Sequence, residues 1–353
     1  MSNINVLNIS ETTKGGIETF MNSLRTSEFV NNEFLLPDYD FSIYKYTRSN
    51  KRFNNLIHLI IILYKLDFKK YKFIFLHSTF AGLLRPILYL FSFFYDFKVV
   101  YCSHGWSWDM SEKGILSKYI YVFVEYVLSF FCHGVVCVSN HDYFSANKYN
   151  LRNLKVIQNG VRDTQLKNID KHSSFTANFL FVGRLDRQKG LFEFLNSINQ
   201  VNIPYEINLK VIGMPVVDDI HKFEFLKSNK FKNINVEFLG WVDNADLDSY
   251  YFESDVTIIP SLYEAFGLVV IESIRNSTPV LVSNKGALPL IVTDEIGWVY
   301  DIDNLKSLED SLCSINKESV LKRSSTCRDV FSRLYHQDIM NKDYFLYFKS
   351  IAA

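Results

Sequence analysis

Cysteine pairs and an overall charge are missing from this chain of 353 residues. Its five cysteines are an odd number and none form a C-x-x-C pair, so neither a disulfide framework nor a zinc ribbon is expected. We expect buried thiols in a reducing cytosol. The 38 basic and 38 acidic residues cancel, which argues against a nucleic-acid partner bound through an overall positive field.

Long hydrophobic runs are also missing. The longest stretch without Asp, Glu, Lys or Arg spans residues 126–141, and its 16 residues are too few and too polar to cross a bilayer. Residues 1–10 lack the basic region of a secretory signal, so none is expected. Hydrophobic residues nevertheless make up 48% of the chain, which excludes disordered and fibrous proteins.

The two halves of the chain carry opposite charges. Residues 1–165 hold 18 basic and 13 acidic residues, a net of +5, which leaves 20 and 25, a net of −5, for residues 166–353. The positive excess is concentrated in residues 44–72, around an apolar run at residues 56–64. Such a segment suits an anionic membrane surface. A buried helix with solvated ends is equally consistent, because the apolar residues surround the helix.

Apolar runs of strand length alternate with helix-compatible segments. Strands apolar on both faces and separated by helices predict parallel sheets covered on both sides. We therefore expect an α/β fold of two tandem Rossmann-like, doubly wound domains with a cleft between them. The expected strands are 6–9, 73–76, 99–102, 135–138 and 155–157, then 179–182, 209–212, 236–239, 256–259 and 279–282.

The domain boundaries follow from a polar, weakly patterned stretch between residues 161 and 178. We place one domain at residues 1–165, a second at 166–335, and a C-terminal helix at 336–353 that returns to the first domain. Because ligands of such sheets bind at the carboxyl ends of strands, the loops that follow the strands should carry the chemistry.

The first such loop is Lys14-Gly15-Gly16-Ile17-Glu18. Its two glycines would let the backbone approach a ligand closely, and the helix start behind them favours an anion. A simple turn explains the pattern equally well. The loop is neither G-x-G-x-x-G nor a P-loop, which argues against a dinucleotide oxidoreductase.

A second loop, residues 183–190, carries Arg184 and Lys189 directly after a strand. Two cations five positions apart can hold a diphosphate from two directions. The alternative is a solvated basic turn in which Asp186 and Arg187 pair with these charges.

A third loop places Glu264 before Gly267, which opens an apolar helix containing Glu272. Carboxylates accept hydrogen bonds from vicinal sugar hydroxyls, and N–H groups near Gly267 suit a diphosphate. The two glutamates would lie roughly 10 Å apart, comparable to the reach of a nucleotide sugar from hexose to ribose. A chance pair is disfavoured, because a glutamate in an apolar loop is costly without a partner.

Together these loops resemble the retaining GT-B glycosyltransferases of family 4. The segment from Glu264 to Glu272 is similar to the E-x₇-E motif of that family, and the resemblance spans nearly the whole chain. Gln158 is a departure, since it stands where the family often has proline. The other similar segments are the loop 14–18, Ser103-His104-Gly105, Val138-Ser139, residues 156–161 and residues 183–190.

The resemblance implies that residues 1–165 bind the acceptor and that residues 166–335 bind a nucleoside-diphosphate sugar. It implies that Glu264 holds the sugar, Glu272 the ribose, and that His104 reaches the sugar near the reacting carbon. The implied catalytic residues are His104, Glu264, Arg184 and Lys189. The implied donor-binding residues are Gly15, Gly16, Arg184, Lys189, Trp241, Val242, Glu264, Ala265, Phe266, Gly267, Leu268 and Glu272.

Neither a cofactor nor a metal ion is expected. Preorganised cations and a helix start can stabilise the charge that develops on a leaving diphosphate. Three Asp-x-Asp strings, at residues 38–40, 246–248 and 301–303, are interpreted as turns or helix starts.

We therefore expect a glycosyltransferase of bacterial polysaccharide biosynthesis, of the lipopolysaccharide or O-antigen type. It would act on a membrane-linked glycan or lipid-linked oligosaccharide at the cytoplasmic face of the plasma membrane. The alternatives are a nucleotide-sugar epimerase or hydrolase, and a non-catalytic membrane-associated binder of sugar nucleotides. For His104 a structural role stays open, as does a place for His77 in the cleft. Trp106 and Trp108 would stack on the acceptor or pack in the core.

Overall fold

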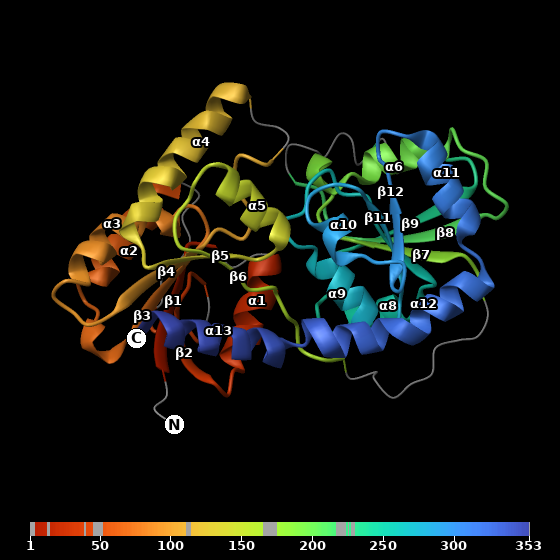
Figure 1. The fold of residues 1–353 in the computed structure, drawn as a ribbon. Helices are drawn as coiled ribbons and strands as arrows, with labels where there is room; N and C mark the ends of the chain where they lie inside the picture. The colour runs from red at the N-terminus through yellow and green to blue at the C-terminus, as the bar shows by residue number, and fades with distance from the viewer. Residues whose placement is uncertain are drawn as a thin grey trace. The chain divides into compact units, whose positions relative to one another are not determined.

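The structure is a computed structural model that describes residues 4–12, 15–38, 40–44, 52–110, 114–164, 175–216, 224, 226 and 230–352. The chain forms two compact units, each built on one sheet (Figure 1). Unit 1 comprises Met1–Val161 and Gln337–Ala353, and unit 2 comprises Arg162–His336. Sequence analysis places these boundaries at residues 165 and 335.

The sheet of unit 1 has six parallel strands in the order β2-β1-β3-β4-β5-β6. The strands are β1 (Ile4–Ser10), β2 (Val30–Leu35), β3 (Phe73–His77), β4 (Lys98–Cys102), β5 (Gly134–Cys137) and β6 (Leu154–Val156). The helices are α1 (Gly16–Arg25), α2 (Arg52–Leu63), α3 (Arg85–Phe91), α4 (Ile115–Leu128), α5 (Asn140–Lys148) and α13 (Gln337–Ala352). The register pairs Ser10 with His77 and His77 with Cys102, so the carboxyl ends of three strands meet at one edge.

The sheet of unit 2 also has six parallel strands, in the order β12-β11-β10-β7-β8-β9. The strands are β7 (Asn178–Val182), β8 (Ile207–Ile212), β9 (Ile234–Gly240), β10 (Val256–Ile259), β11 (Val280–Ser283) and β12 (Gly297–Tyr300). The helices include α6 (Leu191–Ile198), α8 (Leu247–Glu253), α9 (Leu268–Arg275), α10 (Leu288–Ile291), α11 (Leu305–Ser314) and α12 (Lys317–Val330).

The predicted α/β class and both parallel sheets are confirmed. Two strands escaped the sequence analysis, for physical reasons. Strand β2 has the sequence VNNEFL, and only its ends are buried, so no apolar run marks it. Strand β12 is only four residues long, begins with glycine and exposes Val299.

The C-terminal helix α13 packs on unit 1. Nδ2 of Asn341 donates to the carbonyl of Ser23 on α1 at 3.1 Å, and the ring of Phe348 stacks on Phe73 of β3 at 4.6 Å. The N–H of Gln337 donates to the carbonyl of Val161, where the chain leaves unit 1. Both ends of the chain therefore contribute to one unit.

Four of the five cysteines are buried, as predicted, but Cys313 is exposed. Burial raises the pKa of the Cys132 thiol to about 11, which keeps it protonated and unreactive. In the part of the chain that the structure describes, no helix is long and apolar enough to cross a membrane.

Candidate active site

Two loops of unit 2 that are far apart in sequence are joined by backbone contacts. The N–H of Leu262 donates to the carbonyl of Gln188 at 2.8 Å, and Nε2 of Gln188 donates to the carbonyl of Tyr263 at 3.2 Å. Gly190 has φ +69°, and a Cβ there would lie 2.0 Å from the carbonyl oxygen of Pro260. Only glycine allows this approach, so the loop 183–190 and the loop that begins at Pro260 form one surface.

Lys189 and Glu264 face each other across this junction. Nζ of Lys189 lies 2.5 Å from Oε1 of Glu264, and Oγ of Ser261 donates to the same oxygen at 3.0 Å. The two side chains are only 19% and 12% exposed. Partial burial strengthens the attraction between them relative to a surface pair. The structure thus brings together two of the residues that the sequence predicts to act on the donor.

Arg184 takes a different position. Its guanidinium is 57% exposed and lies 2.9 Å from Oδ2 of Asp186. Oδ1 of Asp186 also accepts a hydrogen bond from the N–H of Lys189, which caps the short 3-10 turn Arg187–Lys189. The alternative in which Asp186 pairs with a cation of this loop therefore holds for Arg184 but not for the Lys189 side chain.

Glu272 lies on α9, and its Oε2 accepts a hydrogen bond from the hydroxyl of Tyr251 on α8 at 3.0 Å. Burial raises the pKa of Glu272. The charge of Arg275, the hydrogen bond from Tyr251 and the charge of Lys189 act in the opposite direction and lower this pKa. The ammonium of Lys189 therefore acts on both glutamates of the motif.

The loop before α9 is fixed by a contact that the sequence did not reveal. The N–H of Ala287 donates to the carbonyl of Glu264 at 2.8 Å, and a Cβ at Gly286 would lie 2.2 Å from that oxygen. Gly267 has φ +100° and directly precedes the helix. Ala265, Phe266, Gly267 and Leu268 form the backbone between Glu264 and the start of α9, and the ring of Phe266 is buried.

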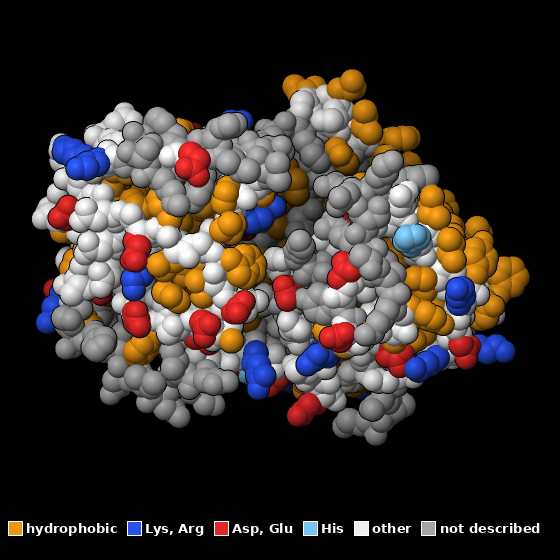
Figure 2. Space-filling view, turned by 180° about the vertical axis from the view of Figure 1, so that it is seen from behind, with side chains coloured by type: hydrophobic (Ala, Val, Ile, Leu, Met, Phe, Trp, Pro, Cys, Tyr) orange, Lys and Arg blue, Asp and Glu red, His pale blue; other side chains and the backbone are white. Residues whose placement is uncertain are grey.

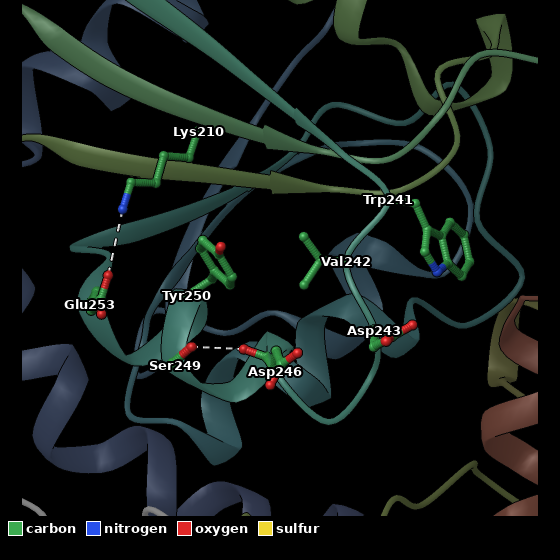
Figure 3. Close-up of a pocket in the computed structure, with 8 residues that line it drawn as sticks. All are labelled: Lys210, Trp241, Val242, Asp243, Asp246, Ser249, Tyr250 and Glu253. Carbon is green, nitrogen blue, oxygen red and sulfur yellow. Dashed lines mark hydrogen bonds and ion pairs between the residues drawn. The ribbon is translucent and has the colours of Figure 1, made fainter.

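Trp241 and Val242 line a surface hollow of about 690 Å³ in the same unit (Figure 3). Trp241 is 68% exposed and lies at one end, while Lys210 and Glu253 pair at the other at 3.5 Å. Lys189, Glu264 and Glu272 do not line this hollow. Its remaining lining residues are Asp243, Asp246, Ser249 and Tyr250.

The predicted residues of unit 1 lie at the carboxyl ends of β1 and β4. Gly15 has φ +74° and precedes Gly16, the first residue of α1, and both are exposed; Lys14 lies outside the described residues. His104 follows β4 with φ +57°, which is rare for a residue with a side chain. Its Nε2 lies 3.1 Å from Nδ1 of His77, at the end of β3.

Both histidines of this pair are held neutral. Burial lowers the pKa of His104 to about 4. Burial, together with the neighbouring His104, lowers the pKa of His77 well below its ordinary value. The ring of Phe20 packs edge-on against His104, with centroids 4.7 Å apart. At neutral pH His104 is therefore a hydrogen-bonding group and carries no charge.

Trp106 and Trp108 belong to the core, so stacking on an acceptor is wrong for both. They are 1% and 2% exposed, and their rings stack on each other at 4.6 Å. Each indole N–H has a protein partner: Trp106 donates to the carbonyl of Asp142, and Trp108 donates to Oγ of Ser145.

Carboxylates of two Asp-x-Asp strings are paired within unit 2. Oδ1 of Asp248 lies 2.6 Å from Nη2 of Arg275, and Oδ2 of Asp303 lies 2.5 Å from Nζ of Lys285. Among the residues that the structure describes, no group of three or more His, Cys, Asp or Glu side chains could hold a metal ion.

Known proteins match both the fold and the second unit. Residues 164–328 match the family described as Glycosyl transferases group 1, a span that contains both joined loops. Sucrose-phosphate synthase from Thermosynechococcus elongatus superimposes with a TM-score of 0.77 at 17% identity, covering 99% of each chain. Anabaena Alr3699/HepE, solved with UDP and glucose, gives a TM-score of 0.76 at 15% identity, covering 99% of this chain and 100% of that chain.

Two proteins of known sequence are also similar to this chain over most of its length. An uncharacterized 41.2 kDa protein in the cps region of Klebsiella pneumoniae is 28% identical over 367 residues, which are 98% of this chain and 100% of that protein. The Escherichia coli UDP-Gal:alpha-D-GlcNAc-diphosphoundecaprenol alpha-1,3-galactosyltransferase is 27% identical over 293 residues, covering 76% of this chain and 73% of that enzyme.

The fold and the joined loops thus define a two-domain protein of the GT-B type. Its second unit is a glycosyltransferase group 1 domain, and the protein is a glycosyltransferase.

Proposed function

We propose that this enzyme transfers a sugar from a nucleoside-diphosphate sugar to a glycan carried on a membrane-anchored lipid diphosphate. The reaction retains the anomeric configuration, needs no metal ion, and serves bacterial surface-polysaccharide synthesis. The single observation that carries the proposal is the Lys189–Glu264 pair between two loops joined by backbone hydrogen bonds.

The pair suggests how the donor is received. A diphosphate draws the ammonium of Lys189 away from Glu264, and the freed carboxylate accepts hydrogen bonds from sugar hydroxyls. Arg184, which is already exposed, adds a second cation. As the glycosyl bond breaks, both cations stabilise the negative charge on the leaving diphosphate. Glu272 holds the ribose, and the base lies near Trp241 and Val242.

The relatives support the choice of donor and acceptor. The Escherichia coli relative uses UDP-Gal and a diphosphoundecaprenol acceptor by its name, and the Klebsiella pneumoniae relative is encoded in the cps region. The Anabaena structure contains UDP and glucose. A UDP-hexose and a polyprenyl-diphosphate-linked sugar are therefore the first substrates to test.

An unusual helix of unit 1 supports a membrane-bound acceptor. Helix α4 carries only two charged residues, Lys118 and Glu125. Glu125 is turned inward, where its Oε2 lies 2.6 Å from Nη2 of Arg85 and its Oε1 accepts from the hydroxyl of Tyr101. Apolar side chains are turned outward in its place: Ile115, Leu116, Tyr119, Ile120, Phe123, Tyr126 and Val127 are all more than a third exposed.

We call these seven residues of α4 the apolar face. Residues three, four and seven positions apart share one side of a helix, so the face is continuous along α4. Leu90 of α3 and Phe93 and Phe94 just beyond it are further exposed apolar residues of unit 1, and Tyr89 contacts both Phe93 and Phe131, which lies in the turn after α4. Figure 2 shows hydrophobic side chains over α4 and along the adjoining edge of unit 1.

Charge favours an anionic bilayer as the partner of this face. Unit 1 holds 19 basic and 14 acidic residues, a net of +5. The guanidinium of Arg152 lies 3.9 Å from the ring of Phe130, which is exposed just beyond α4. A cation beside exposed aromatic rings suits the boundary between acyl chains and anionic headgroups. We therefore place the enzyme peripherally on the cytoplasmic face of the plasma membrane.

The structure describes only part of the segment 44–72, whose membrane role stays a prediction. Residues 45–51, which contain three of its basic residues, lie outside the described part of the chain. Within α2, Leu59 and Leu63 are buried in the core, whereas Ile57 and Ile61 are exposed. The described part of the segment thus combines a buried side with an exposed apolar side.

A thermal-shift panel of UDP-, GDP- and ADP-sugars tests the donor assignment. A ligand that binds only the native state raises the melting temperature by mass action. We expect a UDP-hexose to raise it, and EDTA to leave both the shift and the transfer rate unchanged. Proton NMR of the product from an α-linked donor should show an α-linkage. No shift with any nucleotide sugar, or a β-linked product, would contradict the proposal.

A further inference from the structure

A chain of side-chain hydrogen bonds runs through unit 1 from the end of α1 to His104. It passes from the carbonyl of Leu24 through Asn32, Asn8 and His77. We infer that this chain fixes which ring nitrogen of His104 carries the proton, and that His77 is a positioning residue for sugar transfer. The inference rests on the proposed function and on the role that the family resemblance implies for His104, which is to reach the donor sugar near the reacting carbon.

The donor-to-acceptor direction of these hydrogen bonds is set at Asn32. Its Nδ2 lies 2.9 Å from the carbonyl of Leu24 and 3.5 Å from that of Val30. A carbonyl oxygen can only accept, so the amide nitrogen must face these two groups. The amide oxygen of Asn32 therefore faces Asn8 as an acceptor.

Asn8 is oriented by a second backbone carbonyl. Its Nδ2 donates to Oδ1 of Asn32 at 2.9 Å and also to the carbonyl of Glu33 at 3.3 Å. Two acceptors thus hold the same nitrogen, and the amide oxygen of Asn8 is turned toward His77. Asn8 is completely buried, which makes the opposite orientation costly because its amide oxygen would then face two other acceptors, Oδ1 of Asn32 and the carbonyl of Glu33.

The proton positions on both histidines follow from these orientations. Nε2 of His77 lies 3.1 Å from Oδ1 of Asn8, an acceptor, so this nitrogen carries the proton. His77 is fully buried and neutral, so its Nδ1 has only a lone pair. Nε2 of His104 lies 3.1 Å from that lone pair and must therefore donate. His104 is left with a proton on Nε2 and a lone pair on Nδ1.

This tautomer restricts what His104 can do to a substrate. Its Nδ1 can accept a hydrogen bond from a sugar hydroxyl but cannot donate one. The edge-on contact with Phe20 also holds the ring in place. A ring fixed in both orientation and tautomer needs no reorganisation when the donor arrives. His77 fixes the tautomer of His104 because it carries its own proton on Nε2 and offers the lone pair of Nδ1 to His104.

Nitrogen-15 NMR of the full chain, labelled at histidine, measures the tautomer directly. In the wild-type protein at pH 7.5 we expect both His77 and His104 to show a protonated Nε2 and an unprotonated Nδ1. A protonated Nδ1 on His104 would overturn the inference. Because this readout needs no turnover, it stays decisive even if the chain transfers no sugar, so it separates the inference from the proposed function.

Two variants of His77 test its effect on the reaction. His77→Phe keeps a buried ring but removes the acceptor, and we expect mixed tautomers of His104 and a kcat lowered about ten- to a hundredfold. KM for the donor should change little, since the phosphate and ribose contacts lie in unit 2. His77→Gln restores an amide donor toward Asn8 and an amide acceptor toward His104, so it should recover most of the rate.

Circular dichroism and melting temperature establish whether each variant is folded. A folded His77→Phe protein with wild-type tautomer and kcat would overturn the inference. The same conclusion follows if His77→Gln is as slow as His77→Phe while its His104 tautomer is wild-type. Should His77→Phe fail to fold, the NMR measurement on the wild-type and His77→Gln proteins decides the question.

Discussion

Nζ of Lys189 lies 2.5 Å from Oε1 of Glu264, although the two residues belong to different loops. In this arrangement the cation and the carboxylate neutralise each other before any donor arrives. A nucleoside-diphosphate sugar offers each of them a new partner: phosphate for the ammonium, and hydroxyls for the carboxylate. The pair therefore holds both groups in a fixed orientation in a partly buried place.

Lys189→Met tests how much the cation of this pair contributes to the chemical step. Loss of a preorganised cation at the leaving diphosphate is expected to lower kcat about a hundredfold. Steady-state kinetics with a saturating donor measures this effect. Lys306→Met is the matched control, because Lys306 of α11 is also an ion-paired lysine but lies on an exposed helix. Equal losses in the two variants would contradict a specific role for Lys189.

Glu272→Gln should stabilise the fold and weaken donor binding. Because burial raises the pKa of Glu272 above its unfolded value, its contribution to stability is present at low pH. That contribution is lost as the pH rises from the unfolded pKa through the folded one. Glutamine still accepts from Tyr251 but has no charge to bury, so we expect a melting temperature about 2 °C higher at pH 7.5.

The same variant should show no gain in melting temperature at pH 4, where the wild-type carboxyl is largely protonated in both states. Donor KM should rise about tenfold, since the ribose loses a charged acceptor. Calorimetric melting at both pH values and a donor titration check these outcomes. A variant that is less stable at pH 7.5 would show that the negative charge of Glu272 is favourable in the folded protein.

Exposed residues of the apolar face should govern membrane binding. Replacing Leu116 and Phe123 together with serine is expected to reduce flotation with phosphatidylglycerol vesicles at least fivefold, because each large apolar side chain contributes roughly 2 kcal/mol on burial. Leu346→Ser on α13 is the control, since Leu346 is also exposed on unit 1. Unchanged flotation of the double variant would contradict this membrane surface.

Breaking the buried pair beneath α4 should destabilise unit 1. Arg85 and Glu125 are 0% and 4% exposed at their side chains, and the guanidinium also lies 3.8 Å from the ring of Tyr101. Glu125→Gln would leave a buried cation without its counter-charge, which costs about 3 kcal/mol.

The double variant Arg85→Met, Glu125→Leu should recover most of that loss, because neither charge is then buried. Urea unfolding of wild type, single and double variants gives the comparison. Equal stability of Glu125→Gln and wild type would mean that α4 is held by its apolar contacts alone.

The sequence predicted the fold and the separate motifs better than it predicted their partners. Apolar runs marked ten of the twelve strands that the structure describes, since β-strands buried on both faces have few polar residues. The sequence also showed the spacing of Glu264, in a loop, and Glu272, in the helix that follows this loop. It did not show their partners from distant segments: Lys189 and Ala287 contact Glu264, and Tyr251 contacts Glu272.

Burial decided the residues on which the sequence left alternatives open. Trp106 and Trp108 pack in the core, and His77 lies beneath His104 without reaching the surface. The apolar face of α4 was missed because its sequence is apolar almost throughout, so hydropathy alone does not say which side turns outward. The buried salt bridge of Glu125, made with a residue 40 positions away, determines that orientation.

Glu264→Gln tests the central claim most directly, through the rate of sugar transfer to a polyprenyl-diphosphate-linked acceptor. Loss of the carboxylate removes both the partner of Lys189 and the charged acceptor for sugar hydroxyls, so kcat/KM should fall at least about a hundredfold. Glu318→Gln, at the start of α12, should leave the rate unchanged. A folded Glu264→Gln protein that transfers sugar at the wild-type rate would contradict the assignment of this pair as the donor site.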